Sequence, residues 1–157
     1  MTPALQLRDL VDGDFPIFFE HQRDEVSARM AAFGTKDSTA DELAARWKRG
    51  IAAGGTRHKA IIAGGDVVGF VATFFHEEKL QVTYWIARAH WGRGIASAAL
   101  TQLLALVTTR PIYASAAKDN IGSLRVLQKC GFTIRGTARA FANARGEEIE
   151  EVLLVLE

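Results

Sequence analysis

The chain has 157 residues, of which 48% are apolar, and its 19 basic and 18 acidic side chains leave a formal net charge of +1. This length is typical of a single domain with its own core, and the balanced charge argues against nucleic acid as a partner. Since no apolar run approaches the ~20 residues of a membrane span and no basic-then-apolar leader opens the chain, we expect a cytoplasmic protein with no membrane partner.

The N-terminal third begins with a strand pattern followed by helix patterns. Leucines alternate with polar side chains over residues 5–10, which predicts a strand. Asp14 follows a glycine turn and can cap a helix over residues 15–21. Residues 25–33 predict a second, short helix that ends near Gly34.

A third helix is predicted by its cap and by its apolar face. Thr39 or Ser38 can cap it, and Glu42, three residues after Thr39, completes a capping box. Four apolar residues then recur on one face: Leu43, Ala44, Trp47 and Ile51. On the residues alone this segment is an amphipathic helix.

From residue 60 the period of the apolar residues changes from that of a helix to that of strands. Residues 60–63 and 67–74 are apolar and flank Gly64-Gly65-Asp66, which predicts a hairpin with a glycine turn. Residues 76–79 form a polar turn, and a strand rich in β-branched and aromatic residues follows from Gln81.

This strand leads through Trp91-Gly92-Arg93-Gly94 into a helix over residues 95–107. A glycine turn that opens a helix presents free backbone N–H groups and the positive end of the helix dipole, which suits a phosphate. A tight turn with no ligand is the alternative. The sequence lacks the Gly-Lys-Ser/Thr of a P-loop and the third glycine of the dinucleotide motif.

The last third predicts a strand, a helix and a hairpin. Residues 112–116 form a short buried strand, and Asn120 or Asp119 caps a helix whose apolar face ends at Cys130. We expect this single cysteine to be part of the core rather than a nucleophile, in a reducing compartment. The final hairpin pairs residues 132–134 with residues 149–156.

Two of these segments resemble the GNAT superfamily of acyl-CoA-dependent N-acyltransferases, in particular its RimJ/RimL-like branch. TYWIARAHWGRGIASAAL is similar to the fourth strand, pyrophosphate loop and following helix, and KDNIGSLRVLQKCGF to the second motif. Trp91 replaces the Gln or Arg of the wider superfamily, as is common in that branch. The resemblance implies an α/β (α+β) fold: a single domain over residues 1–157, with a mixed, mainly antiparallel sheet splayed between the fourth and fifth strands and helices on both faces.

The resemblance also implies a site for acetyl-CoA and no metal. Backbone N–H groups of residues 92–97 would hold the pyrophosphate, and the exposed end of the fourth strand would pair with the pantetheine arm. Asn120 would contact that arm, and Ser123 would donate a hydrogen bond to the departing thiolate. On the residues alone, both are better explained as a helix cap and a first-turn residue. The implied cofactor contacts are Trp85, Ile86, Ala87, Arg88, Trp91, Gly92, Arg93, Gly94, Ile95, Ala96, Ser97 and Asn120.

A general base is not apparent in the sequence. Many members of the branch have Glu at the position of Gln81, and Gln cannot accept a proton. The candidates to replace it are Glu20, His21, His76 and Glu77, or a water chain. An acceptor with a weakly basic amine would need less help.

We therefore expect an N-acetyltransferase that moves an acetyl group from acetyl-CoA to a primary amine by direct attack. The acceptor would be a protein N-terminal α-amine or a small-molecule amine. The alternatives are a non-catalytic acyl-CoA-binding module, motivated by Gln81, and an αβ domain with no ligand. Because members of this fold often dimerise, a homodimer is a further possibility.

Overall fold

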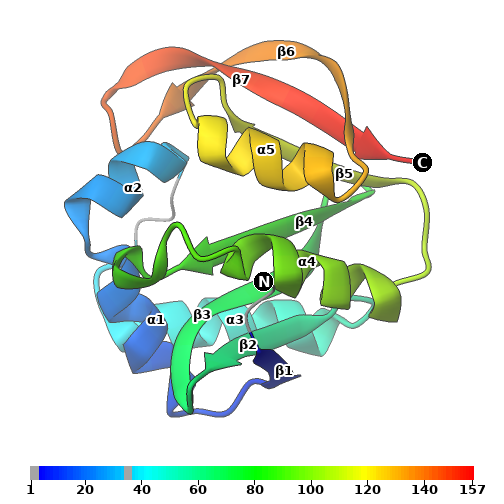
Figure 1. Cartoon of the computed structure of the whole chain (residues 1–157). Helices are drawn as coiled ribbons and strands as arrows, with labels where there is room; N and C mark the ends of the chain where they lie inside the picture. The colour runs from blue at the N-terminus through cyan, green and yellow to red at the C-terminus, as the bar shows by residue number, and fades with distance from the viewer. Residues whose placement is uncertain (1–3, 34–36) are drawn as a thin grey trace.

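The computed structural model describes residues 4–33 and 37–157, so the predicted helix end near Gly34 lies outside the described residues. Figure 1 shows the elements, which follow in this order: β1 (Leu5–Asp9), α1 (Asp14–Gln22), α2 (Glu25–Ala31), α3 (Ala40–Ala53), β2 (His58–Ala63), β3 (Asp66–His76), β4 (Lys79–Ile86), the 3₁₀ helix η1 (Arg88–His90), α4 (Ile95–Leu106), β5 (Ile112–Ala117), α5 (Ile121–Lys129), β6 (Thr133–Ala142) and β7 (Glu147–Leu156).

The strands form one sheet in the order β1-β2-β3-β4-β5-β7-β6. Neighbouring strands are antiparallel except β4 and β5, which are parallel and pair only at Gln81 and Tyr113. All the other neighbours pair over five residues or more. The mixed sheet that separates between its fourth and fifth strands is therefore confirmed.

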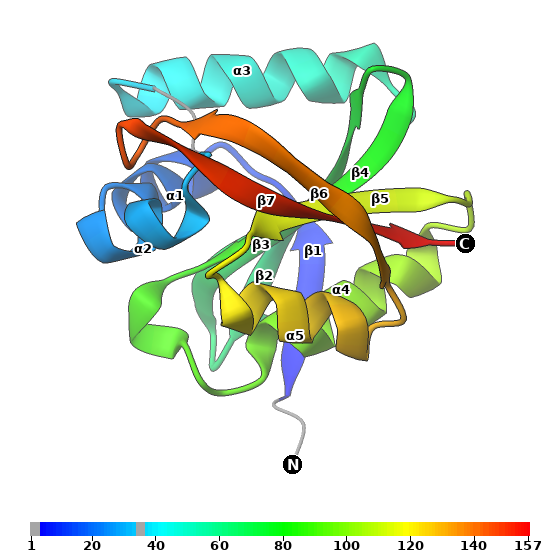
Figure 2. The same ribbon diagram turned by 90° about the horizontal axis from the view of Figure 1, so that it is seen from above.

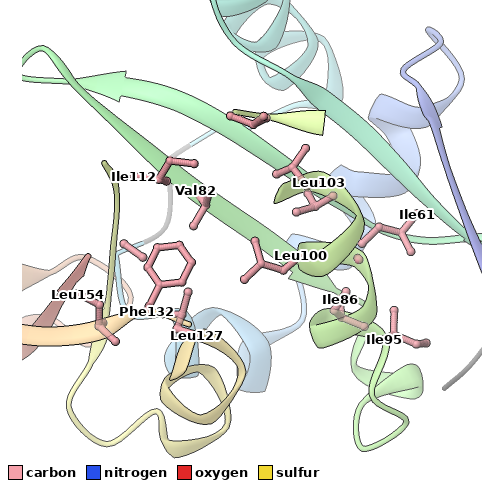
Figure 3. Close-up of a cluster of buried hydrophobic side chains, with 14 of the residues drawn as sticks. Ile61, Val82, Ile86, Ile95, Leu100, Leu103, Ile112, Leu127, Phe132 and Leu154 are labelled. Carbon is pink, nitrogen blue, oxygen red and sulfur yellow. The ribbon is translucent and has the colours of Figure 1, made fainter. Parts of the chain in front are cut away.

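Helices cover both faces of the sheet, as Figure 2 shows with α3 on one side and α4 and α5 on the other. On the α3 side, Trp47 packs with Phe18 and Phe70. On the α4 side, Leu100 and Leu103 lie in a buried cluster with residues from five strands (Figure 3). Among the described residues, no helix has both the length and the apolar character to cross a bilayer.

The capping box of α3 is present with a small shift. Thr39 Oγ1 accepts a hydrogen bond from Glu42 N–H at 3.1 Å, as predicted. The Glu42 carboxylate reaches back to Ser38 N–H at 2.7 Å instead of to Thr39. Both interactions satisfy N–H groups near the helix start, which fixes where α3 begins.

The start of α1 differs from the prediction, because Asp14 does not cap the helix. The N-cap is Gly13, and the buried Asp14 carboxylate accepts from Val11 N–H at 2.9 Å and from the Arg8 guanidinium at 2.8 Å. Burial alone would raise the pKa of Asp14, but Arg8 and the Val11 N–H outweigh burial and lower it. Asp14 therefore joins the end of β1 to α1 as a charged group.

The final hairpin is longer than predicted. β6 and β7 run over residues 133–142 and 147–156, where the sequence predicted residues 132–134 and 149–156. β6 is an edge strand with mostly exposed or half-exposed side chains, so it lacks the apolar periodicity that marks a strand. The acidic residues at the start of β7 are paired in part, with Glu150 bound to Lys118 at 2.9 Å.

Candidate active site

A cavity of about 1040 Å³ opens where β4 and β5 diverge. Its lining falls into two groups of residues, which we call its ends and which meet where Asn120 Nδ2 donates to Met30 O at 3.3 Å. The residues that define what we call the α4 end are Trp91, Gly92, Gly94, Ile95, Ala96, Ser97, Asn120 and Ser123. The residues that define the α2–α3 end are Met30, Ala31, Phe33, Trp47, Gly50, His58, Phe70 and Phe74.

The α4 end is formed by a helix start that no side chain caps. Gly94 is the N-cap of α4 and has left-handed backbone angles, with φ of 75°. By contrast, the side chains of Asp24, Thr39 and Asn120 cap α2, α3 and α5. The first-turn N–H groups of α4 therefore combine with the helix dipole in a position suited to an anion.

Neither predicted arginine lines the cavity. Arg88 forms an ion pair with Asp24, with Nε and Oδ2 3.1 Å apart, and Arg93 is exposed. The anion site predicted at this turn thus depends on backbone groups, and contacts from the two arginines to phosphate stay predictions.

The backbone of β4 alternates in direction, which sharpens the prediction for the cofactor arm. Ala87 N–H donates to Val68 O at 2.8 Å, so this group faces away from β5. Alternation places the N–H and C=O groups of Trp85 on that same side, and those of Tyr84 and Ile86 on the side of β5. Tyr84 and Ile86 are therefore better placed than Trp85 and Ala87 to pair with a ligand in the gap.

Trp91 has a structural role in this arrangement. Its indole Nε1–H donates to Ile86 C=O at 2.8 Å, which joins the glycine turn to the end of β4. This contact uses a carbonyl at the edge that faces β5, and it leaves Ile86 N–H in position for a ligand. It also gives a physical reason for tryptophan at this position.

Asn120 is engaged by the protein at both ends of its side-chain amide. Oδ1 accepts from Ser123 N–H at 3.2 Å, which confirms the predicted N-cap, and Nδ2 donates to Met30 O at 3.3 Å. The second contact ties α2 to α5 across the gap between β4 and β5. A direct contact from Asn120 to the cofactor stays a prediction.

Ser123 lies in the cavity wall beside a residue that the sequence analysis missed. Its Oγ is 2.6 Å from the hydroxyl oxygen of Tyr84, which also lines the cavity. Burial raises the pKa of Tyr84 to about 12, so the phenol keeps its proton at neutral pH. The alternation of Val82, Tyr84 and Ile86 places Tyr84 on the face covered by α4 and α5, but sequence alone does not show which helix residue it meets.

The α2–α3 end is largely aromatic. The ring of Trp47 packs edge-on against Phe70, with centroids 4.8 Å apart, and against His58, with centroids 5.7 Å apart. Burial lowers the pKa of His58, so its imidazole is neutral at neutral pH and able to accept a proton. Thr56 Oγ1 lies 3.3 Å from His58 Nε2.

The four predicted candidates for the base lie elsewhere. None of Glu20, His21, His76 and Glu77 is among the described residues that line the cavity, whereas Gln81 is. The histidines in the lining are His58 and His90, neither of which the sequence pattern singled out. In the described part of the chain, no group of His, Cys, Asp and Glu residues has the arrangement of a metal site.

Comparison with known proteins identifies the family. The profile described as acetyltransferase (GNAT) domain matches residues 4–133 of the chain. The protein belongs to the GNAT acetyltransferase family. No curated protein matches this chain.

Solved structures share the fold of this GNAT domain at low identity. They include a spermidine N-acetyltransferase from Vibrio cholerae in complex with CoA and spermine (TM-score 0.83, 19% identity, 97% of this chain and 94% of that one). A phosphinothricin acetyltransferase from Sinorhizobium meliloti in complex with AcCoA has a TM-score of 0.85 and 20% identity, over 99% of this chain and 88% of that one. A ribosomal-protein-alanine N-acetyltransferase from Brucella melitensis has a TM-score of 0.84 and 17% identity, over 96% of this chain and 98% of that one. Their variety does not single out the RimJ/RimL-like branch.

Proposed function

We propose that this protein is an acetyl-CoA-dependent N-acetyltransferase that acetylates a primary amine, either a protein N-terminal α-amine or a small-molecule amine. The observation that carries the proposal is the uncapped start of α4, which lines a large cavity at the divergence of β4 and β5 in a GNAT domain. Two structures with this fold hold CoA or acetyl-CoA, which supports the same co-substrate here.

The residues of the α4 end fit that co-substrate. The first-turn N–H groups at residues 94–97, all of which line the cavity, would bind the diphosphate. The N–H of Ile86, on the strand edge that faces β5, would pair with an amide of the arm. Acetyl-CoA supplies the thioester, and Ser123 would donate a hydrogen bond to the departing sulfur.

The reaction also needs an amine that has lost its proton. Gln81 stands where β4 and β5 meet and cannot accept one. His58 is a candidate for the task, because it lines the cavity and its imidazole is neutral, with one ring nitrogen that carries no proton. We propose that His58 takes the proton from the acceptor, directly or through water. The aromatic residues around it favour an acceptor with an apolar body.

A non-catalytic acyl-CoA-binding module is the second candidate, and Gln81 is the feature that favours it. Thiol release from acetyl-CoA separates the two, measured with a panel of α-amino peptides, spermidine, phosphinothricin and aromatic amines. The proposal predicts turnover with at least one class of acceptor. Binding of CoA without turnover on any acceptor would support the module instead. If CoA far above micromolar concentration fails to raise the melting temperature, both candidates are wrong.

A further inference from the structure

We propose that Tyr84 is a positioning residue for acetyl transfer: its phenol donates to Ser123 Oγ and thereby directs the serine's own proton to the thioester sulfur. This inference rests on the proposed function. It adds a residue on β4 to a role that the sequence resemblance implied for Ser123 alone. Two residues 39 positions apart would then act together across the gap between β4 and α5.

The geometry places both hydroxyls in the cavity wall. Tyr84 Oη and Ser123 Oγ are 2.6 Å apart, a short hydrogen bond. The backbone of Ser123 is held by Asn120, whose Oδ1 accepts from Ser123 N–H at 3.2 Å. The helix cap therefore holds the backbone of Ser123, and the phenol holds its hydroxyl.

Chemistry decides which hydroxyl donates. A phenol is a far stronger acid than an aliphatic alcohol and is therefore the better donor. Its buried position keeps Tyr84 protonated at neutral pH. Tyr84 Oη also lies 3.4 Å from Ser123 C=O, but Ser123 Oγ is much closer. With the phenol as donor, Ser123 Oγ accepts one hydrogen bond and its single proton is left for the sulfur.

This arrangement assists one step of the reaction. As the amine nitrogen forms its bond to the acetyl carbon, the carbon–sulfur bond breaks and its electron pair stays on sulfur. The amine gives up a proton to the proposed base, His58, or to water. Neither hydroxyl has to lose its proton, because the thiolate of a thiol with a pKa of about 8.5 needs only hydrogen bonding. Two hydroxyls in series polarise each other, so the serine donates more strongly than it would alone.

The chain offers a matched control for the test. It contains two tyrosines, Tyr84 on β4 and Tyr113 on β5. Tyr84→Phe and Tyr113→Phe each remove one phenolic oxygen, but Tyr84 lines the cavity and Tyr113 does not. We expect Tyr84→Phe to lower kcat about tenfold with KM for acetyl-CoA within about twofold, and Tyr113→Phe to leave kcat within about twofold. An unchanged kcat in Tyr84→Phe would overturn the inference.

A double-mutant cycle separates positioning from a general structural effect. If Tyr84 acts through Ser123, Tyr84→Phe adds less than about twofold in the Ser123→Ala background. A full tenfold loss in that background would contradict the inference. Acetyl-CoA turnover by the unchanged chain is measured first, so failure of the proposed function is distinguished from failure of the role of Tyr84.

A spectroscopic measurement serves if Tyr84→Phe does not fold. Tyr113→Phe protein grown with 3-fluorotyrosine carries its only fluorinated phenol at residue 84. Its fluorine resonance should shift when Ser123→Ala is added, because the phenol loses its partner. A resonance that does not respond to Ser123→Ala would contradict the hydrogen bond on which the inference depends.

Discussion

The two ends of the cavity are built from different chemical groups. At the α4 end, the predicted anion site consists of backbone N–H groups at one turn, and its key requirement is a glycine with left-handed backbone angles. The α2–α3 end consists of side chains from α2, α3, β2 and β3, dominated by aromatic rings. A site made from backbone tolerates wide changes in sequence, whereas a site made from side chains changes with every substitution. We therefore expect the α4 end to carry what this protein shares with its family, and the α2–α3 end to carry what is particular to it.

The largest effect should come from displacing β4, whose residues Gln81 to Ile86 line the cavity. A Cβ on Gly69 would lie 2.0 Å from Trp85 O and 3.1 Å from Ile86 Cα, so Gly69→Ala must displace β4. We expect a loss of about 3 kcal/mol in the free energy of unfolding and weaker binding of CoA. Gly136→Ala, in β6, meets no atom within 4 Å and is the control, measured by denaturant unfolding. Equal stability of the two variants would contradict the close approach of β3 to β4.

The next largest effect should come from a change at the α4 end alone. Valine at position 94 would be held at φ near 75°, which costs about 1–3 kcal/mol for a β-branched residue. We expect Gly94→Val to weaken CoA binding at least tenfold, measured by calorimetry. Gly13→Val is the matched control, because Gly13 also precedes a helix but has an ordinary φ of −66°. If both variants bind CoA as the original chain does, the turn is not the anion site.

A third change adds a proton-accepting side chain to the cavity wall. We expect Gln81→Glu to raise kcat/KM for a strongly basic amine about fivefold at pH 7, because the new carboxylate can accept its proton. The gain should appear as pH rises through the carboxyl pKa of about 4.3 and remain above it. Gln22→Glu puts a carboxylate elsewhere in the same cavity wall. An equal gain in Gln22→Glu would show attraction of the amine rather than base catalysis.

The smallest effect tests whether the α2–α3 end receives the acceptor. Phe74 and its neighbour Phe75 are both exposed, but only Phe74 lines the cavity. We expect Phe74→Ala to raise KM for the acceptor about threefold, or roughly 0.7 kcal/mol, with CoA affinity unchanged. Phe75→Ala should change neither quantity. A loss of CoA affinity in Phe74→Ala would mean that the two ends are not independent.

Most of the fold was accessible from the sequence because its signals are local. Glycine turns, caps such as Thr39 and Asn120, and the apolar period of α4 each depend on residues close together in the chain. β6 was underestimated because an exposed edge strand carries little apolar period. Asp14 was misassigned as a cap because its partner, Arg8, lies in the preceding strand.

In the site, too, local features could be predicted and contacts between distant elements could not. The turn at Gly94 could be predicted, because the residues that form it are adjacent. The pair of Tyr84 and Ser123 could not, since it depends on how β4 and α5 pack. His58 stands on β2, where a histidine among apolar residues gives no sign that it faces a cavity. Contacts between distant elements are set by packing, which the sequence pattern does not show.

A crystal structure with acetyl-CoA bound tests the central claim most directly. The account predicts the diphosphate within hydrogen-bonding distance of the N–H groups at residues 94–97, and the thioester sulfur beside Ser123 Oγ. A diphosphate bound elsewhere, with the start of α4 facing only solvent or protein, would contradict it.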